Sequence, residues 1–299
     1  MIDFPIVDPH QHLWDFEVCR YPWLMDRPLP HNPAGDCSAI ARPYGLDDYL
    51  RDTAGWNIAR TVHVDAGAVA DDALRESAWL QETADRRGYP HGIVAWADLR
   101  HPRIDRQLAA QRAHRNVRGI RQIANWHADP LKTYNTQDPL GDPYWLRGFA
   151  LLRKHELSFD LQIYPGQMPA AAALAARHPD THIILNHAGM PTDRDAAGLA
   201  AWRSGMALLA RQPNVLVKIS GLAMIDRQWT VDSIRPFVLD TIELFGPARC
   251  MFASNFPVDR LYGDFGRHYQ AYDDIVAAFG EAERRQLFAE TAMKAYRLD

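Results

Sequence analysis

The chain has 299 residues, a formal net charge of −4 at pH 7, and 47% hydrophobic and 23% charged residues. This composition is typical of a globular protein. The small negative charge argues against binding to nucleic acid or to an anionic membrane. We therefore expect a small-molecule substrate as the partner, and association between identical chains is left open.

The three cysteines, Cys19, Cys37 and Cys250, show no paired spacing, which is typical of a reducing compartment. Residues 1–5 lack the basic and apolar regions of a secretion signal. No apolar run approaches the roughly 20 residues that a membrane-spanning helix needs. The sequence therefore predicts a cytoplasmic protein.

A pair of histidines follows the first apolar run of the chain. Residues 4–7 predict a short buried strand that ends at Asp8, and His10 and His12 come next. Side chains alternate along an extended chain, so an extended course would turn both imidazoles to the same side. Two imidazoles at a strand end can hold a divalent metal or polarise an oxygen atom. The alternative is a pair of solvent-exposed loop histidines.

A long loop is expected after this strand, at residues 15–43. It is rich in proline and is bordered by Trp14, while Tyr21 and Trp23 lie within it. Long loops in compact domains are usually functional. We predict that these aromatic residues line a substrate pocket, with Trp14 as the substrate-binding candidate.

From residue 60 onward, short β-rich runs alternate with helical patterns. Further strands are expected at residues 60–65, 92–97, 117–123, 159–164, 182–187, 214–219 and 250–255. Helices are expected at residues 46–56, 71–87, 104–114, 144–155, 168–177, 197–211, 231–245, 269–279 and 281–296. A second long loop, residues 124–142, follows the fourth strand.

Eight strands that alternate with helices predict an α/β protein, a single (β/α)8 TIM barrel domain over residues 1–299. The alternative is an open doubly wound sheet. That alternative is weakened because Asp8-Pro9-His10, and not a glycine-rich turn, follows the first strand.

Functional groups of such barrels lie at the carboxyl ends of the strands. The polar residues expected there, besides the histidine pair, are Asp65, Arg121, Gln162, Tyr164, His187, Lys218, Asn255 and Asp259. We predict that Arg121, Gln162 and Tyr164 contact substrate, although a structural ion pair explains Arg121 equally well. Lys218 is either a cation of the site or, as we favour, a lysine whose ammonium reaches solvent.

Seven segments, in order along the chain, carry a family resemblance. They are VDPHQHLW (7–14), YPWL (21–24), VRGIR (117–121), FDL (159–161), NHAGMP (186–191), VKISGL (217–222) and MFASNFPV (251–258). On these segments the chain resembles the amidohydrolase-related proteins of the metal-dependent hydrolase type. The similarity is to the branch that contains L-fuconolactonases and pyrone-dicarboxylate lactonases. The resemblance implies a TIM barrel that opens lactone rings by attack of water.

The resemblance also implies roles for individual residues. His10, His12 and His187 would bind the carbonyl oxygen, either directly or through one divalent ion, zinc or manganese. Members of this branch differ in whether they use a metal, so both alternatives stay open. Arg121 would contact the substrate.

The chain departs from the family pattern at Asn255, where such proteins usually carry an aspartate that acts as general base. A neutral amide cannot accept a proton from water. Three alternatives follow: another carboxylate takes the proton, a bound metal lowers the pKa of that water, or the reaction is a different one. Asp65 and Asp259 are the predicted carboxylates, since both lie just past a strand end, and Asn255 would help to position the water.

The sequence is therefore compatible with three functions. The first is a hydrolase for a small sugar-acid or aromatic-degradation lactone. The second is a metal-dependent decarboxylase that uses the same histidines. The third is a non-catalytic sugar-acid-binding protein, which the replacement of the aspartate by Asn255 would explain.

Overall fold

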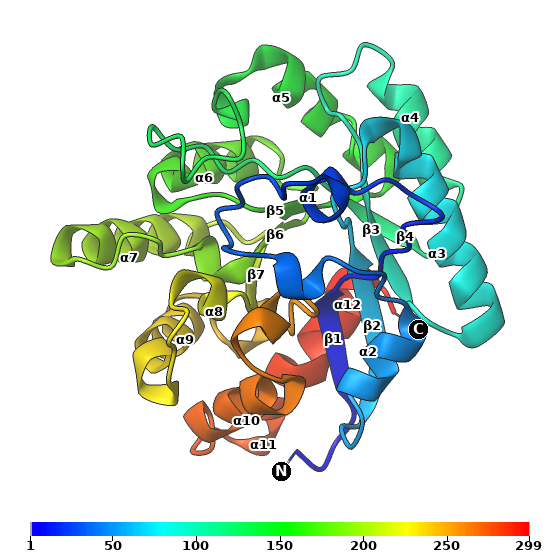
Figure 1. Cartoon of the computed structure of the whole chain (residues 1–299). Helices are drawn as coiled ribbons and strands as arrows, with labels where there is room; N and C mark the ends of the chain where they lie inside the picture. The colour runs from blue at the N-terminus through cyan, green and yellow to red at the C-terminus, as the bar shows by residue number, and fades with distance from the viewer. Residues whose placement is uncertain (1, 299) are drawn as a thin grey trace.

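Eight parallel strands form one sheet in the computed structural model, which describes residues 2–298. In the sheet, each strand pairs with its neighbour in sequence (Figure 1). The strands are β1 (Ile6–Gln11), β2 (Ile58–Val64), β3 (Gly92–Trp96), β4 (Val117–Arg121), β5 (Ser158–Leu161), β6 (Ile183–Leu185), β7 (Val215–Ile219) and β8 (Cys250–Phe252). The predicted (β/α)8 barrel is confirmed.

The sheet closes on itself through the residues just past β8. The backbone N–H of Asn255 donates to the carbonyl of His10 at 2.8 Å, and the N–H of His12 donates to the carbonyl of Phe256 at 2.7 Å. The Ser254 hydroxyl adds a bond to the carboxylate of Asp8 at 2.6 Å. Closure therefore brings Asn255 directly beside the histidine pair.

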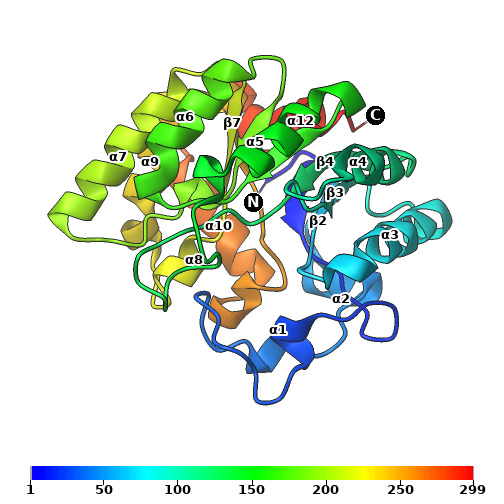
Figure 2. The same cartoon turned by 90° about the horizontal axis from the view of Figure 1, so that it is seen from above.

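Helices follow most strands and surround the sheet (Figure 2). They are α1 (Pro22–Met25), α2 (Leu46–Asp52), α3 (Ala73–Arg87), α4 (Ile104–Arg112), α5 (Pro143–Ala150), α6 (Met168–Arg177), α7 (Ala196–Ala210), α8 (Leu222–Ile225), α9 (Val231–Phe245), α10 (Phe265–Ile275), α11 (Glu281–Arg285) and α12 (Thr291–Tyr296). No helix within residues 2–298 is long and apolar enough to cross a membrane.

Several predicted boundaries were wrong by a few residues, and the predicted helix at residues 281–296 is divided into α11 and α12. Two of the differences have a clear local cause. Strand β1 continues past the predicted end at Asp8 to Gln11. Its pairing with β2 shifts register between Asp8 and Gln11. This shift passes over Pro9, which has no N–H to donate to the sheet. Helix α10 begins four residues before the predicted start, because the Asp264 carboxylate caps it by accepting from the N–H of Arg267 at 2.7 Å.

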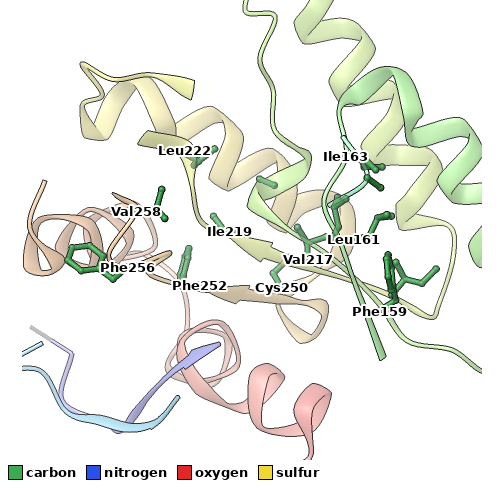
Figure 3. Packing of buried hydrophobic residues seen from close by; sticks show 14 of the residues in the cluster. Phe159, Leu161, Ile163, Val217, Ile219, Leu222, Cys250, Phe252, Phe256 and Val258 are labelled. Atoms are coloured by element: carbon green, nitrogen blue, oxygen red, sulfur yellow. The ribbon is translucent and has the colours of Figure 1, made fainter. Parts of the chain in front are cut away.

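Two hydrophobic layers hold the barrel together. The outer layer lies between the strands and the helices, and Figure 3 shows part of it, with Leu161 of β5, Val217 of β7 and Phe252 of β8. The inner layer fills the barrel with valines of β1 to β3 and packs against Tyr296 of α12. Figure 2 shows α12 and α1 at opposite ends of the barrel. The end opposite α12, which we call the mouth, is left for the site.

Candidate active site

Three histidines from two strands meet at the mouth. The ring centroids of His10 and His12 lie 4.9 Å apart, and those of His10 and His187 lie 4.7 Å apart. The extended course of β1 turns His10 and His12 to the same side, as the spacing predicts. His187 follows β6 with φ of 56°, a left-handed conformation of the kind found at functional sites.

Hydrogen bonds fix the proton position on His12. Its Nδ1 lies 2.7 Å from the carbonyl oxygen of Val64, which only accepts, so Nδ1 carries the hydrogen. The other nitrogen, Nε2, therefore has a lone pair, and it lies 3.3 Å from Oδ1 of Asn255. The Asn255 amide presents this oxygen because its Nδ2 donates to Oδ1 of Asp259 at 2.8 Å. Two acceptors thus face each other.

His10 lies beneath these groups with no partner for either ring nitrogen and no exposed surface. Burial lowers the pKa of all three histidines, in the case of His12 to about 3. The positive charges of Lys218 and Arg121 lower these pKa values further. The cluster is therefore neutral at pH 7, and its lone pairs are free to accept a hydrogen bond or hold a cation.

Arg121, at the end of β4, is held by residues that follow β2 and β5. Its Nη1 donates to the side-chain oxygen of Gln162 at 3.2 Å, and its Nη2 donates to the backbone carbonyl of Asp65. Its Nε lies 3.4 Å from the Asp65 carboxylate, which also accepts from the N–H of Gly67. Burial raises the pKa of Asp65, although Arg121 opposes this. Asp65 therefore supports the guanidinium of Arg121.

Asp259 supports the other side of the cluster. Its second oxygen accepts from the N–H of Gly221 at 3.2 Å, and burial raises its pKa to about 7. Gly221 has φ of +63°, and a Cβ there would lie 2.5 Å from Nδ1 of His187. Only glycine fits this position without displacing His187, whose Nδ1 also bonds the Ser220 hydroxyl at 2.9 Å.

These groups border a cavity of about 360 Å³ at the mouth. Its polar lining includes His12, His31, Asn32, Arg121, Thr133, Tyr134, Gln162, His187 and Asn255. Both long loops contribute walls, as expected of functional loops. Within residues 2–298, no carboxylate lines this cavity. Asp65 and Asp259 do not line the cavity, but each contacts a residue that does. Asp65 contacts Arg121, and Asp259 contacts Asn255.

The structure places two predicted substrate-binding residues away from this cavity. Trp14 is fully buried and donates from Nε1 to the carbonyl of Arg42 at 2.6 Å. Trp23, whose ring lies 5.5 Å from that of Trp14, lines the cavity instead. Tyr164 lines a second, outer pocket and donates to the carbonyl of Lys132 at 2.5 Å. Trp23 lies in the loop at residues 15–43, whose aromatic residues were predicted to line a pocket. Its position in that loop was therefore the sequence feature that indicated its place at the cavity.

Lys218 does not reach solvent, so the favoured prediction for it was wrong. Its side chain is fully buried and donates to the carboxylate of Asp160 at 2.5 Å. Tyr296 of α12 donates to the same carboxylate at 2.9 Å. A buried lysine needs such a partner. Asp160 lies on β5, two strands away from β7 in the sheet, so the sequence does not reveal the pairing.

The donor set at the mouth bears on the predicted divalent ion. Among residues 2–298, no three His, Cys, Asp or Glu side chains are arranged to hold one. One pair of donors has a suitable spacing. Two ligands each about 2.1 Å from a tetrahedral ion lie about 3.4 Å apart, and His12 Nε2 and Asn255 Oδ1 are 3.3 Å apart. This pair would supply two ligands, and the three histidines do not complete the set.

Comparison with known sequences identifies relatives along the whole chain. A family model described as Amidohydrolase matches residues 7–298. A protein named y4mH from Sinorhizobium fredii is 44% identical over 299 residues, which is 100% of both chains. An L-fucono-1,5-lactonase from Burkholderia multivorans is 29% identical over 98% of this chain and 96% of its own.

Comparison with solved structures agrees. A crystal structure of an amidohydrolase from Burkholderia multivorans with bound HEPES has a TM-score of 0.82 and 28% identity, over 99% of this chain and 100% of that one. A second crystal structure of an amidohydrolase from that organism, with bound zinc, has a TM-score of 0.81 and 27% identity, over 99% of this chain and 100% of that one. The resemblance inferred from the seven segments is confirmed, and the chain belongs to the amidohydrolase family.

Proposed function

We propose that the protein hydrolyses a small lactone, of the sugar-acid or aromatic-degradation type. The observation that carries this proposal is the convergence of His12, His187 and Arg121 from three strands around one cavity of about 360 Å³. Neutral imidazoles and a guanidinium are suited to polarising and orienting an ester carbonyl. Family membership and lactonase relatives make the chain a hydrolase of ester bonds.

Arg121 and Gln162 orient the substrate. The guanidinium is fixed by Asp65 on one side and Gln162 on the other, so it presents its remaining N–H groups in one direction. These groups bind the carbonyl oxygen or a carboxylate of the lactone. Trp23 adds an apolar wall to the same cavity. Holding the ring in one position lets a water molecule attack its carbonyl carbon.

His12 and Asn255 hold the attacking water. The lone pair at His12 Nε2 and the side-chain oxygen of Asn255 both border the cavity, so a water bound there can donate a hydrogen bond to either of them. His12 passes a proton from the water, through its unprotonated Nε2, to the ring oxygen as the water oxygen bonds to the carbonyl carbon. The ring C–O bond then breaks, and its oxygen leaves as the hydroxyl of the opened hydroxy acid.

The predicted carboxylates act indirectly in this proposal. Neither Asp65 nor Asp259 lines the cavity, so direct proton transfer to either stays a prediction that the geometry does not favour. Asp65 holds Arg121, and Asp259 holds Asn255.

A metal held by His10, His12 and His187 stays a prediction, which the arrangement of these three side chains does not favour. His12 and Asn255 would hold the ion if it binds. A bound zinc or manganese ion would supply a lower pKa for the attacking water. A cytoplasmic location and association between identical chains also stay predictions.

A screen of aldonolactones and pyrone carboxylates with a pH indicator tests the proposal. Each ring opened at neutral pH releases one proton, whereas loss of CO2 from a carboxylate followed by hydration to bicarbonate releases almost none, so the same assay separates the decarboxylase alternative. His12→Ala should abolish the signal, and His101→Ala, outside the cavity, should not. Absence of turnover over the panel, with zinc and manganese supplied, would contradict the proposal and favour the binding protein.

A further inference from the structure

Asp259 has a specific relation to Asn255. It begins a 3₁₀ turn one helical turn past Asn255, and its N–H donates to the Asn255 carbonyl at 3.1 Å. One carboxylate oxygen accepts from the Asn255 side chain at 2.8 Å, and the other accepts from the N–H of Gly221 at 3.2 Å. Asp259 is 1% exposed, so water does not compete for these contacts.

This contact determines which end of the amide faces the cavity. Asp259 accepts from the Asn255 NH2 through one oxygen and from the N–H of Gly221 through the other, so the NH2 end of the amide faces Asp259. The amide oxygen must then face His12, although a lone pair on Nε2 already faces it at 3.3 Å. Without Asp259, the amide would be more stable in the opposite orientation, with its NH2 donating to Nε2. That orientation would remove the acceptor that holds the water.

We propose that Asp259 is a positioning residue that fixes the Asn255 amide, so that the two side chains together replace a single carboxylate at the end of β8. Asn255 supplies the oxygen that meets the water, and Asp259 supplies the acceptor that holds the NH2 of the amide behind it. This inference rests on the proposed lactonase function for its kinetic consequence, but the orientation of the amide is independent of any substrate.

An exchange of the two residues tests the kinetic part. In Asp259→Asn, the residue at 259 can either donate or accept, so the amide of Asn255 is no longer fixed. We expect kcat to fall about 10- to 100-fold with KM changed less than about three-fold. In the double variant N255D/D259N, the carboxylate at position 255 presents an acceptor to His12, and the amide at position 259 donates to that carboxylate from behind. We expect this exchange to recover at least about ten-fold of the lost kcat.

A substrate-free measurement tests the orientation itself. The ¹⁵N resonances of labelled histidines are recorded in the full-length protein before and after treatment with a chelator. In the wild type, the Nε2 resonance of His12 should be that of a nitrogen that accepts no hydrogen bond from Asn255. In the chelator-treated Asp259→Asn variant the Nε2 resonance should shift, because the turned amide donates to it, and in the double variant it should return. If no lactone is hydrolysed, the proposed function fails, while this resonance still decides the role of Asp259.

Asp264→Asn is the matched control, since Asp264 only caps α10 and lies outside the cavity. It should leave kcat and the His12 resonance unchanged. The melting temperature of each variant separates misfolding from misorientation. An unchanged kcat and resonance in Asp259→Asn would overturn the proposal, and so would a double variant as slow as Asp259→Asn.

Discussion

The buried polar groups in the barrel interior differ from those at the mouth in how completely they are paired. In the interior, Asp160 accepts from both Lys218 and Tyr296, at 2.5 Å and 2.9 Å. At the mouth, both nitrogens of His10 lack a partner, and Nε2 of His12 faces another acceptor. The two groups are close enough that the charge of Lys218 lowers the pKa of His10.

This difference separates structural from functional polarity. A buried polar group that is fully paired stabilises one arrangement of the chain, and losing one partner exposes the other as an unpaired charge. A buried polar atom without a partner destabilises the fold, so it indicates a site that a ligand completes. Substitutions in the interior should therefore change stability, and substitutions at the mouth should change activity.

The largest effect is expected in the interior. Lys218→Met leaves Asp160 buried without its cation, and the free energy of unfolding should fall by about 3–5 kcal/mol. Urea unfolding measures this. Lys132→Met breaks an exposed ion pair of 2.8 Å with Asp193. This change should lower the free energy of unfolding by at most about 1 kcal/mol. Equal losses in the two variants would contradict the comparison.

A smaller effect, on activity, is expected from Arg121→Lys. A lysine cannot bridge Asp65 and Gln162 and still present N–H groups to the cavity, so kcat/KM for the lactone should fall by roughly 10²-fold. Arg118→Lys is the control on the same strand, since Arg118 bonds the carbonyl of Arg115 at 2.6 Å outside the cavity. A similar fall in both variants would argue against substrate contact by Arg121.

Glu76 is intermediate between the paired groups of the interior and the unpaired groups of the mouth, because its carboxyl is buried without a close cation. Tyr21 donates to it at 3.0 Å, and burial, followed by the charge of Asp65, raises its pKa from 4.5 to about 8. The folded protein therefore binds an extra proton between these values, and stability falls as pH rises through this window, by up to about 1.4 kcal/mol per pH unit.

Glu76→Gln removes this titration. The stability of the variant relative to the wild type should increase from pH 5 to pH 8, as measured by urea unfolding at each pH. A constant difference between the two proteins would show that Glu76 titrates normally.

The smallest effect separates the two tryptophans. Trp14→Phe loses one hydrogen bond to the carbonyl of Arg42, so stability should fall by about 1 kcal/mol with KM unchanged. Trp23→Phe should instead raise KM a few-fold, since Trp23 lines the cavity. A raised KM in Trp14→Phe alone would restore the prediction that Trp14 contacts substrate.

The sequence alone determined the barrel and the histidine pair, because both follow from local patterns. Alternating apolar runs and helical periods predict the eight strands, and the two-residue spacing of His10 and His12 turns both rings to one side. The replacement of the family aspartate by Asn255 was also visible in the sequence, with Asp259 nearby.

Only the tertiary structure decided how these groups are paired. The proton on His12 is fixed by the Val64 carbonyl, and the charge of Lys218 is paired with Asp160 across the barrel. The loop after β1 places Trp23, and not Trp14, at the cavity. These contacts join residues distant in sequence, and no local pattern specifies which of several nearby donors or acceptors a buried group will meet once the barrel has closed.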